Sequence, residues 1–204
     1  MVPLREAADL GDERALCILG DYAQYGRAQP IDLEKARNYY GASANKGFGY
    51  GIFSLGQMFF EGKGITKDLA EAARLITIAH NRNVPRATAY LGLMYSQGSY
   101  VEKDLGTARQ LVEKSAVSGD LVGRTFYGVA LRDGLGGPSD QPRSFALLQL
   151  AADTNYPFAN YQLGISYERG AGTAVDKEKA IAAYRKAASG GVAAATQRLK
   201  VLGF

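Results

Sequence analysis

A pattern of residues that recurs every 36 positions constrains the fold of this chain more than any other feature. Each copy has a leucine, or in one copy a tyrosine, followed by a glycine, a second glycine six positions later, and an aspartate six positions after that. The four columns are Leu19, Leu55, Leu91, Tyr127, Leu163 and Leu199; Gly20, Gly56, Gly92, Gly128 and Gly164; Gly26, Gly62, Gly98, Gly134 and Gly170; and Asp32, Asp68, Asp104, Asp140 and Asp176. Because the columns run on without an insertion, they indicate a structural repeat.

The third copy shows how one repeat unit is expected to fold. Ala87, Leu91 and Tyr95 have the spacing i, i+4, i+8, which places them on one face of a helix. Gly98 can adopt the left-handed conformation that ends a helix, and Asp104 is expected to cap the start of a second helix. One helical hairpin cannot bury its apolar face alone, so hairpins must stack on their neighbours. The sequence therefore predicts an all-α fold, an α-α superhelix (solenoid) of helical hairpins.

The repeat register also predicts the organisation of the chain. We expect a single repeat domain over residues 1–204, in which residues 1–11 are the second helix of a truncated unit. Residues 12–191 hold five full repeats, and residues 192–204 are expected to form a C-terminal capping helix. Since the first helix of the truncated unit is missing, we expect the chain to be a piece of a longer protein.

The glycines that follow the leucines are expected to mark close contacts between helices. Glycine in the middle of a helix costs about 1 kcal/mol relative to alanine. Its retention at this position in five units, Gly92 and Gly164 among them, indicates that there is no room for a side chain. We therefore expect the substitution Gly92→Leu to destabilise the fold.

Composition and charge exclude several classes of protein. The net charge is +4 with a pI near 9.1, but the basic residues are scattered rather than clustered, which argues against nucleic-acid binding. The single cysteine, Cys17, cannot form an intramolecular disulfide. No apolar stretch approaches the ~20 residues that span a bilayer, and the N-terminus has no signal-peptide pattern. The compartment stays open: this could be a periplasmic part of a longer envelope protein or a cytoplasmic protein.

The repeat resembles the Sel1-like repeat, a relative of the tetratricopeptide repeat. The fifth unit carries the pattern in full: Ala159, Leu163-Gly164, Tyr167, Gly170, Gly172, Asp176, Lys179-Ala180, Ala187-Ala188 and Gly191. The chain departs from it at Tyr127, Ala23 and Ser144, where the pattern has leucine, an aromatic residue and alanine. The resemblance implies a tetratricopeptide-like solenoid and an adaptor that binds a partner. It also implies one of the settings in which such adaptors occur: bacterial signalling, exopolysaccharide assembly, cell-envelope organisation, host interaction or eukaryotic protein quality control.

The sequence shows no constellation of residues that would carry out catalysis. His80 is the only histidine and occupies a column that is otherwise alanine, so we interpret it as a packing variant near the end of a helix. With Cys17 nearly two repeat units away, neither a zinc site nor a thiolate–imidazole pair is expected. Paired glycines such as Gly170 and Gly172 follow helices rather than strands, which favours structural turns over phosphate loops. We expect no enzyme, no metal and no cofactor.

A stripe of variable residues on the first helices is the candidate binding surface. Its positions are i, i+3, i+7 and i+10, counted from Arg14 in the first unit. By resemblance to the tetratricopeptide fold, this stripe is expected to line the concave groove. Aromatic and arginine side chains are common interface anchors. The candidate partner-binding residues are Arg14, Tyr50, Phe53, Gln57, Phe60, Arg86, Phe158 and Tyr161. The alternative is that these rings pack against the helices of the next unit.

The leading functional hypothesis is a non-catalytic protein–protein interaction module or adaptor. It would bind a protein or peptide partner in the groove, in bacterial signalling or cell-envelope organisation. Two alternatives stay open at this point. One is a glycan-binding component of an envelope or exopolysaccharide assembly, and the other is an inhibitor or immunity protein for an enzyme or toxin.

Overall fold

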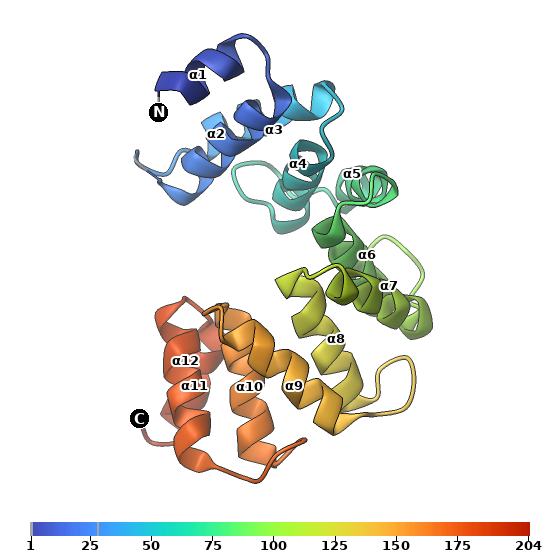
Figure 1. Cartoon of the computed structure of the whole chain (residues 1–204), viewed down its shortest axis with the longest axis vertical. Coiled ribbons are helices and arrows are strands. Elements are labelled where there is room, and N and C mark those ends of the chain that lie inside the picture. The colour runs from blue at the N-terminus through green and yellow to red at the C-terminus, as the bar shows by residue number, and fades with distance from the viewer. Residues whose placement is uncertain (1, 28) are drawn as a thin grey trace. The chain divides into compact units, whose positions relative to one another are not determined.

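The computed structural model describes residues 2–27 and 29–204, which form twelve α-helices and no strand. Figure 1 shows them as consecutive antiparallel hairpins. Their bounds are α1 (Val2–Asp9), α2 (Glu13–Tyr25), α3 (Leu33–Asn45), α4 (Gly49–Glu61), α5 (Leu69–Asn81), α6 (Pro85–Gln97), α7 (Leu105–Val117), α8 (Leu121–Asp133), α9 (Gln141–Ala152), α10 (Pro157–Arg169), α11 (Lys177–Ser189) and α12 (Ala193–Val201). The prediction of an all-α repeat fold is confirmed.

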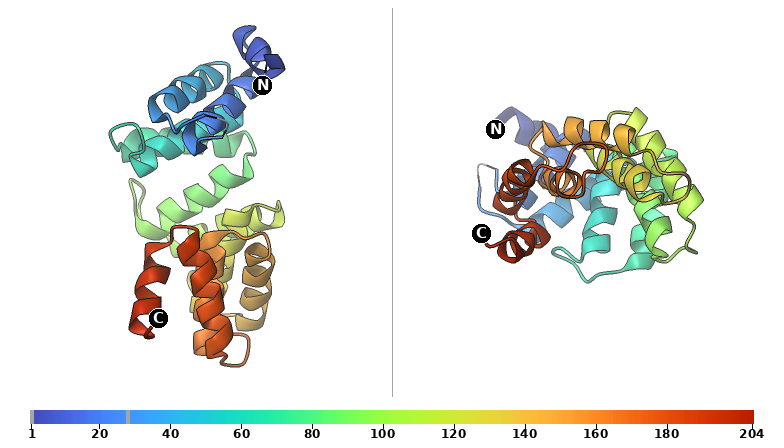
Figure 2. Two further views of the ribbon diagram at one scale, coloured as in Figure 1. Left: turned by 90° about the vertical axis from the view of Figure 1, so that its left-hand side faces the viewer. Right: turned by 90° about the horizontal axis from the view of Figure 1, so that it is seen from below.

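The helices divide into two compact units. The first is Met1–Lys103 with α1 to α6, and the second is Asp104–Phe204 with α7 to α12. In each unit every helix packs against the next one along the chain, which the two views in Figure 2 also show. Each unit is therefore a short stack of hairpins with its own core.

The aspartate column caps the second helices. Asp32, Asp68, Asp104, Asp140 and Asp176 precede α3, α5, α7, α9 and α11, and each side chain accepts a hydrogen bond from a backbone N–H in the first turn. A cap of this kind stabilises a helix by about 1 kcal/mol. The expectation from the sequence is thus confirmed in all five units.

Residues in the left-handed conformation end the helices. Gly26, Gly62, Gly98, Gly134 and Gly170 follow the first helices with φ between +67° and +70°. Asn83 and Asn155 replace the glycine that follows a second helix, and they keep a positive φ of 58° and 60°. Because asparagine tolerates this conformation, the turn survives, and Pro85 and Pro157 then open the next helices.

The two helices of a hairpin meet at the glycine that follows the leucine column of the first helix. A Cβ built on Gly20 would lie 2.5 Å from the ring of Tyr40, and one on Gly164 would lie 2.6 Å from the ring of Tyr184. Tyr40 and Tyr184 are almost completely buried. Gly56 and Gly128 face Ile76 and Leu148 in the same way, so the expected close contact is present in these four hairpins. Gly92 lies buried in α6.

The paired glycines are turns that pack on the preceding hairpin. Gly64, Gly136 and Gly172 have φ between +67° and +76°, and a Cβ on each would collide with Leu33, Leu105 or Gln141 at the start of an earlier second helix. These contacts support the structural interpretation of the glycine pairs. Tyr100 occupies the same column between Gly64 and Gly136 and still adopts a φ of 64°.

Candidate partner-binding surface

The first helices of the unit Met1–Lys103 expose one continuous set of positions. On α2, α4 and α6 the side chains at i, i+7 and i+11, counted from Arg14, are all exposed or half-buried. They are Arg14, Asp21 and Tyr25 on α2, Tyr50, Gln57 and Glu61 on α4, and Arg86, Leu93 and Gln97 on α6. We call this set the first-helix surface.

The i+3 and i+10 positions of the predicted stripe lie on a different face. Cys17 and Phe53 are buried, with only 4% of Phe53 exposed, and Phe60 is half-buried. The reason is that the i+4 residue of the next first helix packs between them. Phe53 therefore does not belong to the exposed groove that the sequence predicts. The alternative prediction, that this ring packs against the next unit, describes the structure.

Tyr90 on α6 is the residue that fills this space. Its ring meets those of Phe53 and Phe60 edge-on, with centroid distances of 5.2 and 5.8 Å. Gln57 donates to the Tyr90 hydroxyl at 2.8 Å and to Glu61 at 2.7 Å, and the hydroxyl donates to Glu61 at 3.2 Å. Edge-to-face ring pairs contribute about 0.5–1.5 kcal/mol beyond burial. Three predicted residues, Phe53, Gln57 and Phe60, are therefore held together by a tyrosine that the prediction did not include.

Charged groups surround Tyr25 at the edge of this cluster. Glu61 forms an ion pair with Lys63 at 2.9 Å. Partial burial and the carboxylates of Asp21 and Glu61 raise the pKa of Tyr25, whereas Lys63 and Arg86 act to lower it. The hydrogen bond from Lys63 to Glu61 raises the pKa of Lys63. Because both signs of charge lie beside an exposed ring, this area can contact polar and apolar groups of a partner.

Arg14 and Tyr50 complete the predicted residues of this unit. Both are exposed, and the Tyr50 ring contacts the Phe48 ring with a centroid distance of 5.7 Å. Half of Tyr50 and 56% of Tyr25 are open to solvent. Exposed tyrosine and arginine side chains are typical of interface anchors.

The predicted residues Phe158 and Tyr161 belong to the second unit. Both rings are half-buried. Phe158 contacts Phe126 of α8 at 5.5 Å, and Tyr161 contacts the buried Tyr184 of α11 at 5.8 Å. Tyr161 thus covers a core residue, while Phe158 and Phe126 form a ring pair on the first helices α8 and α10.

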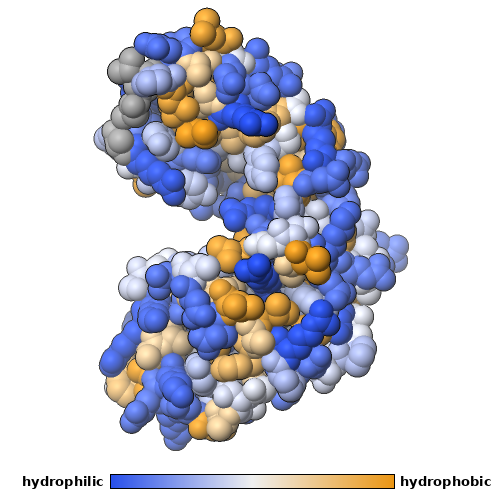
Figure 3. Space-filling model, viewed as in Figure 1, coloured by the Kyte–Doolittle hydropathy of each residue, from blue (hydrophilic) through white to orange (hydrophobic). Residues whose placement is uncertain are grey.

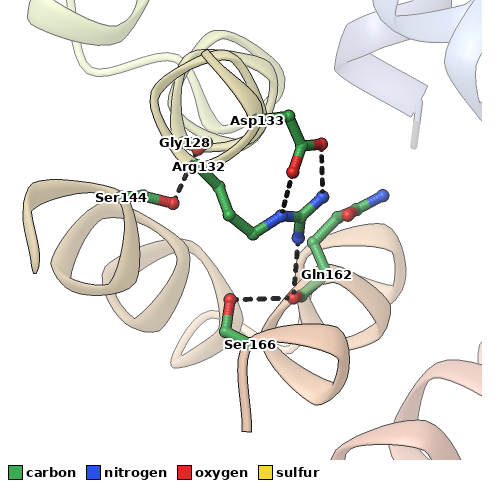
Figure 4. Close-up of polar contacts among 6 residues, drawn as sticks. All are labelled: Gly128, Arg132, Asp133, Ser144, Gln162 and Ser166. Atoms are coloured by element: carbon green, nitrogen blue, oxygen red, sulfur yellow. Dashed lines mark hydrogen bonds and ion pairs between the residues drawn. The ribbon is translucent and has the colours of Figure 1, made fainter. Parts of the chain in front are cut away.

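A buried arginine joins α8 to α10 in the same unit. Figure 4 shows Arg132 between the carboxylate of Asp133 and the backbone carbonyl of Gln162. The ion pair with Arg132 lowers the pKa of Asp133. Arg132 stands at i+10 and Gln162 at i+4 of the next helix, the same relation as Phe60 and Tyr90 in the first unit. At this position the contact between successive first helices is therefore a ring pair in one unit and a hydrogen bond from a guanidinium to a backbone carbonyl in the other.

The side chains with reactive chemistry make structural contacts. His80 Nδ1 lies 2.9 Å from the Thr88 hydroxyl at the join of α5 and α6. Burial, with a contribution from Asp21, raises the pKa of the Cys17 thiol to about 12. Over residues 2–27 and 29–204 no group of histidine, cysteine or carboxylate side chains could hold a metal ion. In the same ranges, every helix is too short or too polar to traverse a lipid bilayer.

Comparison with known families decides what kind of repeat this is. A model of the Sel1 repeat matches residues 14–48, 49–79, 85–120, 123–156 and 157–192. The chain belongs to the Sel1 repeat family. Proteins built from Sel1 repeats are generally protein-interaction modules and non-catalytic scaffolds.

Solved structures show the same fold in other Sel1 repeat proteins. A Sel1 repeat protein from Oxalobacter formigenes is 31% identical with a TM-score of 0.69, over 98% of this chain and 57% of that one. A protective antigen of uropathogenic Escherichia coli strains, which displays an SLR fold, is 26% identical with a TM-score of 0.64, over 96% of this chain and 42% of that one. A sel1 repeat protein from Klebsiella pneumoniae subsp. pneumoniae is 18% identical with a TM-score of 0.70, over 99% and 98% of the two chains, and shows the fold alone.

The chain spans only part of the first two relatives, 57% and 42% of their lengths. No curated protein sequence matches it significantly. None of these comparisons supports the alternative of a glycan partner.

Within this Sel1 repeat array, the sequence reasoning missed Tyr25, Glu61 and Tyr90. Tyr25 and Glu61 stand at i+11 and Tyr90 stands at i+4, each one position beyond the i+10 and i+3 columns of the predicted stripe. One residue along a helix turns the side chain by about 100°. The charged or polar residues at i+11 in every unit, Tyr25, Glu61, Gln97, Asp133 and Arg169, were a signal that this column faces solvent.

Proposed function

We propose that this Sel1 repeat chain is a non-catalytic adaptor module that binds a protein or peptide partner on the first-helix surface. The observation that carries the proposal is the group of Tyr25, Tyr50, Arg14 and Arg86, which are exposed on α2, α4 and α6. Tyrosine and arginine are enriched among the few residues that contribute most to binding at protein interfaces, because each combines a large contact area with hydrogen-bonding groups.

The neighbouring network supports the same proposal. Gln57, Glu61 and Tyr90 are fixed to one another by hydrogen bonds. A surface whose side chains are already ordered loses less conformational entropy when a partner binds. The setting we propose is bacterial signalling or cell-envelope organisation, in line with the bacterial sources of the similar structures.

The test begins with selection of binders from a displayed random-peptide library, followed by fluorescence anisotropy with the selected peptides. We expect Tyr25→Ala and Arg86→Ala to weaken binding about 30-fold each, because truncating an anchor typically costs ~2 kcal/mol. Lys35→Ala, on the second helix α3, is the matched control and should bind like the parent. Melting temperatures should stay unchanged in all three variants.

Phe53→Ala serves as the contrast for a core ring. Since Phe53 is buried, its truncation should lower the free energy of unfolding by roughly 3–5 kcal/mol. Failure to select any peptide, or equal binding by Tyr25→Ala, Arg86→Ala and the parent, would show that the first-helix surface is not the binding site.

A further inference from the structure

An open groove lies on the second-helix side of the unit Met1–Lys103. It runs between α3 and α5 over α4 and has a volume of about 520 Å³. Leu55, Phe59 and Ile65 form its apolar floor, and Arg37 and Asn38 line it from α3. Pockets of a few hundred Å³ with an apolar floor and a few polar groups are typical of binding sites.

Gly41 keeps this groove open. A Cβ added there would have no atom within 4 Å, whereas a Cβ on Gly20, Gly56, Gly128 or Gly164 would lie 2.5 to 3.0 Å from a packed side chain. Glycine weakens a helix, and no packing contact accounts for it at this position. The same column holds Thr77 on α5, and Glu113, Gln149 and Arg185 in the other unit.

In the unit Asp104–Phe204 the corresponding grooves are bridged by the chain itself. Between α7 and α9, Glu113 accepts a hydrogen bond from Tyr127 and pairs with Arg143 at 3.4 Å, while the Arg143 guanidinium lies 5.1 Å from the Tyr127 ring centre. Between α9 and α11, the Tyr167 hydroxyl donates to Gln149 Oε1 at 3.4 Å. The Lys179 ammonium lies 5.6 Å from the centre of the Tyr167 ring. The groove between α3 and α5 has neither bridge, because Gly41 and Leu55 stand in the places of Glu113 and Tyr127.

The charges of the open groove indicate what would bind there. Glu71 is neutralised by a two-bonded ion pair with Arg74. Arg37 has no hydrogen-bond or ion-pair partner among residues 2–27 and 29–204, although its counterpart Arg109 donates to the Pro138 carbonyl at 2.8 Å. The groove therefore combines an apolar floor with one unpaired guanidinium, which binds carboxylates in a two-bonded geometry.

We propose that this groove is a second docking site, which takes a segment of a partner protein that carries an apolar side chain next to a carboxylate. The apolar side chain lies on Leu55, Phe59 and Ile65 in the space above Gly41, and the carboxylate pairs with Arg37. This site is separate from the first-helix surface and does not depend on the function proposed there.

The test is a two-dimensional NMR titration of the whole chain with synthetic peptides. The probe is acetyl-Gly-Ser-Leu-Phe-Glu-Ser-Gly-amide, and the matched peptides carry Gln or Lys in place of Glu. We expect the Glu peptide to shift the amides of Asn38, Gly41 and Asn45 in a saturable way, and the Gln and Lys peptides to bind at least several-fold more weakly. Equal binding of the three peptides, or no shift at these amides, overturns the proposal.

Two variants connect the binding to the groove. Arg37→Gln should lose the preference for the Glu peptide. Gly41→Glu should abolish the shifts, because it places in the groove the side chain that Glu113 has at the same repeat position. Lys35→Gln is the charge-matched control and should bind like the parent. Gly41→Glu replaces a helical glycine at an open position, so its melting temperature should not fall, and lost binding cannot be ascribed to unfolding.

Two further outcomes would assign the groove to another occupant. Binding of 3-phenylpropionate as tight as that of the peptide would indicate a site for small aromatic acids. Concentration-dependent shifts at Gly41 without any probe would indicate a second copy of this chain. Either result overturns docking of a partner segment.

Discussion

Single glycines decide how closely the two helices of a hairpin approach each other. Gly20 and Gly164 receive the rings of Tyr40 and Tyr184, which are among the largest fully buried side chains. The Tyr184 hydroxyl also donates to Glu168 at 2.6 Å, so the ring is fixed at both ends. Any side chain at the glycine must displace this ring or the backbone beneath it.

The substitution Gly164→Leu should lower the free energy of unfolding by more than about 2 kcal/mol through overpacking. Chemical denaturation followed by circular dichroism measures the change. Gly41→Leu is the matched control, because that helical glycine faces open space and its replacement should cost little. Similar losses in both variants would contradict the close-packing explanation.

At the scale of helices, consecutive hairpins meet through pairs of small residues whose sizes compensate each other. Ser43 and Ser115 on second helices face Gly51 and Gly123 on the next first helices. Where the second helix carries alanine, as at Ala79, the facing residue is also alanine, Ala87. The summed size of each pair is kept nearly constant, which sets the distance between the helices.

This compensation predicts a coupled pair of substitutions. Gly51→Ala would place its Cβ 2.6 Å from Ser43 Cβ and should destabilise the chain by roughly 1–3 kcal/mol. Ser43→Ala removes the hydrogen bond to the Glu13 carbonyl and should cost about 1 kcal/mol alone. In the double variant, which reproduces the Ala79–Ala87 pair, we expect a coupling energy of at least about 0.5 kcal/mol in the stabilising direction. Strict additivity in a denaturation cycle would refute the size compensation.

At the scale of the whole molecule, carboxylates stabilise helix starts and helix contacts throughout both units. Hydrogen bonds from Thr107 hold the pKa of Asp104 below its usual value, and a bond from the Lys179 amide does the same for Asp176. Hydrogen bonds from Arg198, then from Tyr184, lower the pKa of Glu168. The hydrogen bonds from Arg74 lower the pKa of Glu71.

These shifts predict acid sensitivity. The folded-state pKa values lie below the ordinary values of 3.8 for aspartate and 4.5 for glutamate. Their contribution to stability is therefore complete above about pH 4.5 and is lost as the pH falls through the folded-state values. We expect a level melting temperature above that pH and a decline below it, with a smaller decline in Glu168→Gln. A melting temperature that rises on acidification would contradict this assignment.

The surface of the molecule shows why exposed side chains are harder to predict than the fold. Hydrophobic residues lie in separate patches among hydrophilic ones on the face that Figure 3 presents. Tyr25 and Tyr50 are exposed, but the similar ring of Phe53 is buried. Residue type alone therefore did not separate exposed rings from core rings.

The sequence by itself determined the Sel1 repeat, the twelve helices and their caps, because these depend on residues close together in one unit. Asp104 and Gly98 act on the turns that they adjoin, and their spacing repeats in every copy. Only the tertiary structure decided which side of each first helix is exposed. Tyr90 fills the space between Phe53 and Phe60, and Gly41 opens a groove that Glu113 closes elsewhere. Both outcomes depend on side chains from a neighbouring hairpin, and the period of one unit carries no information about that contact.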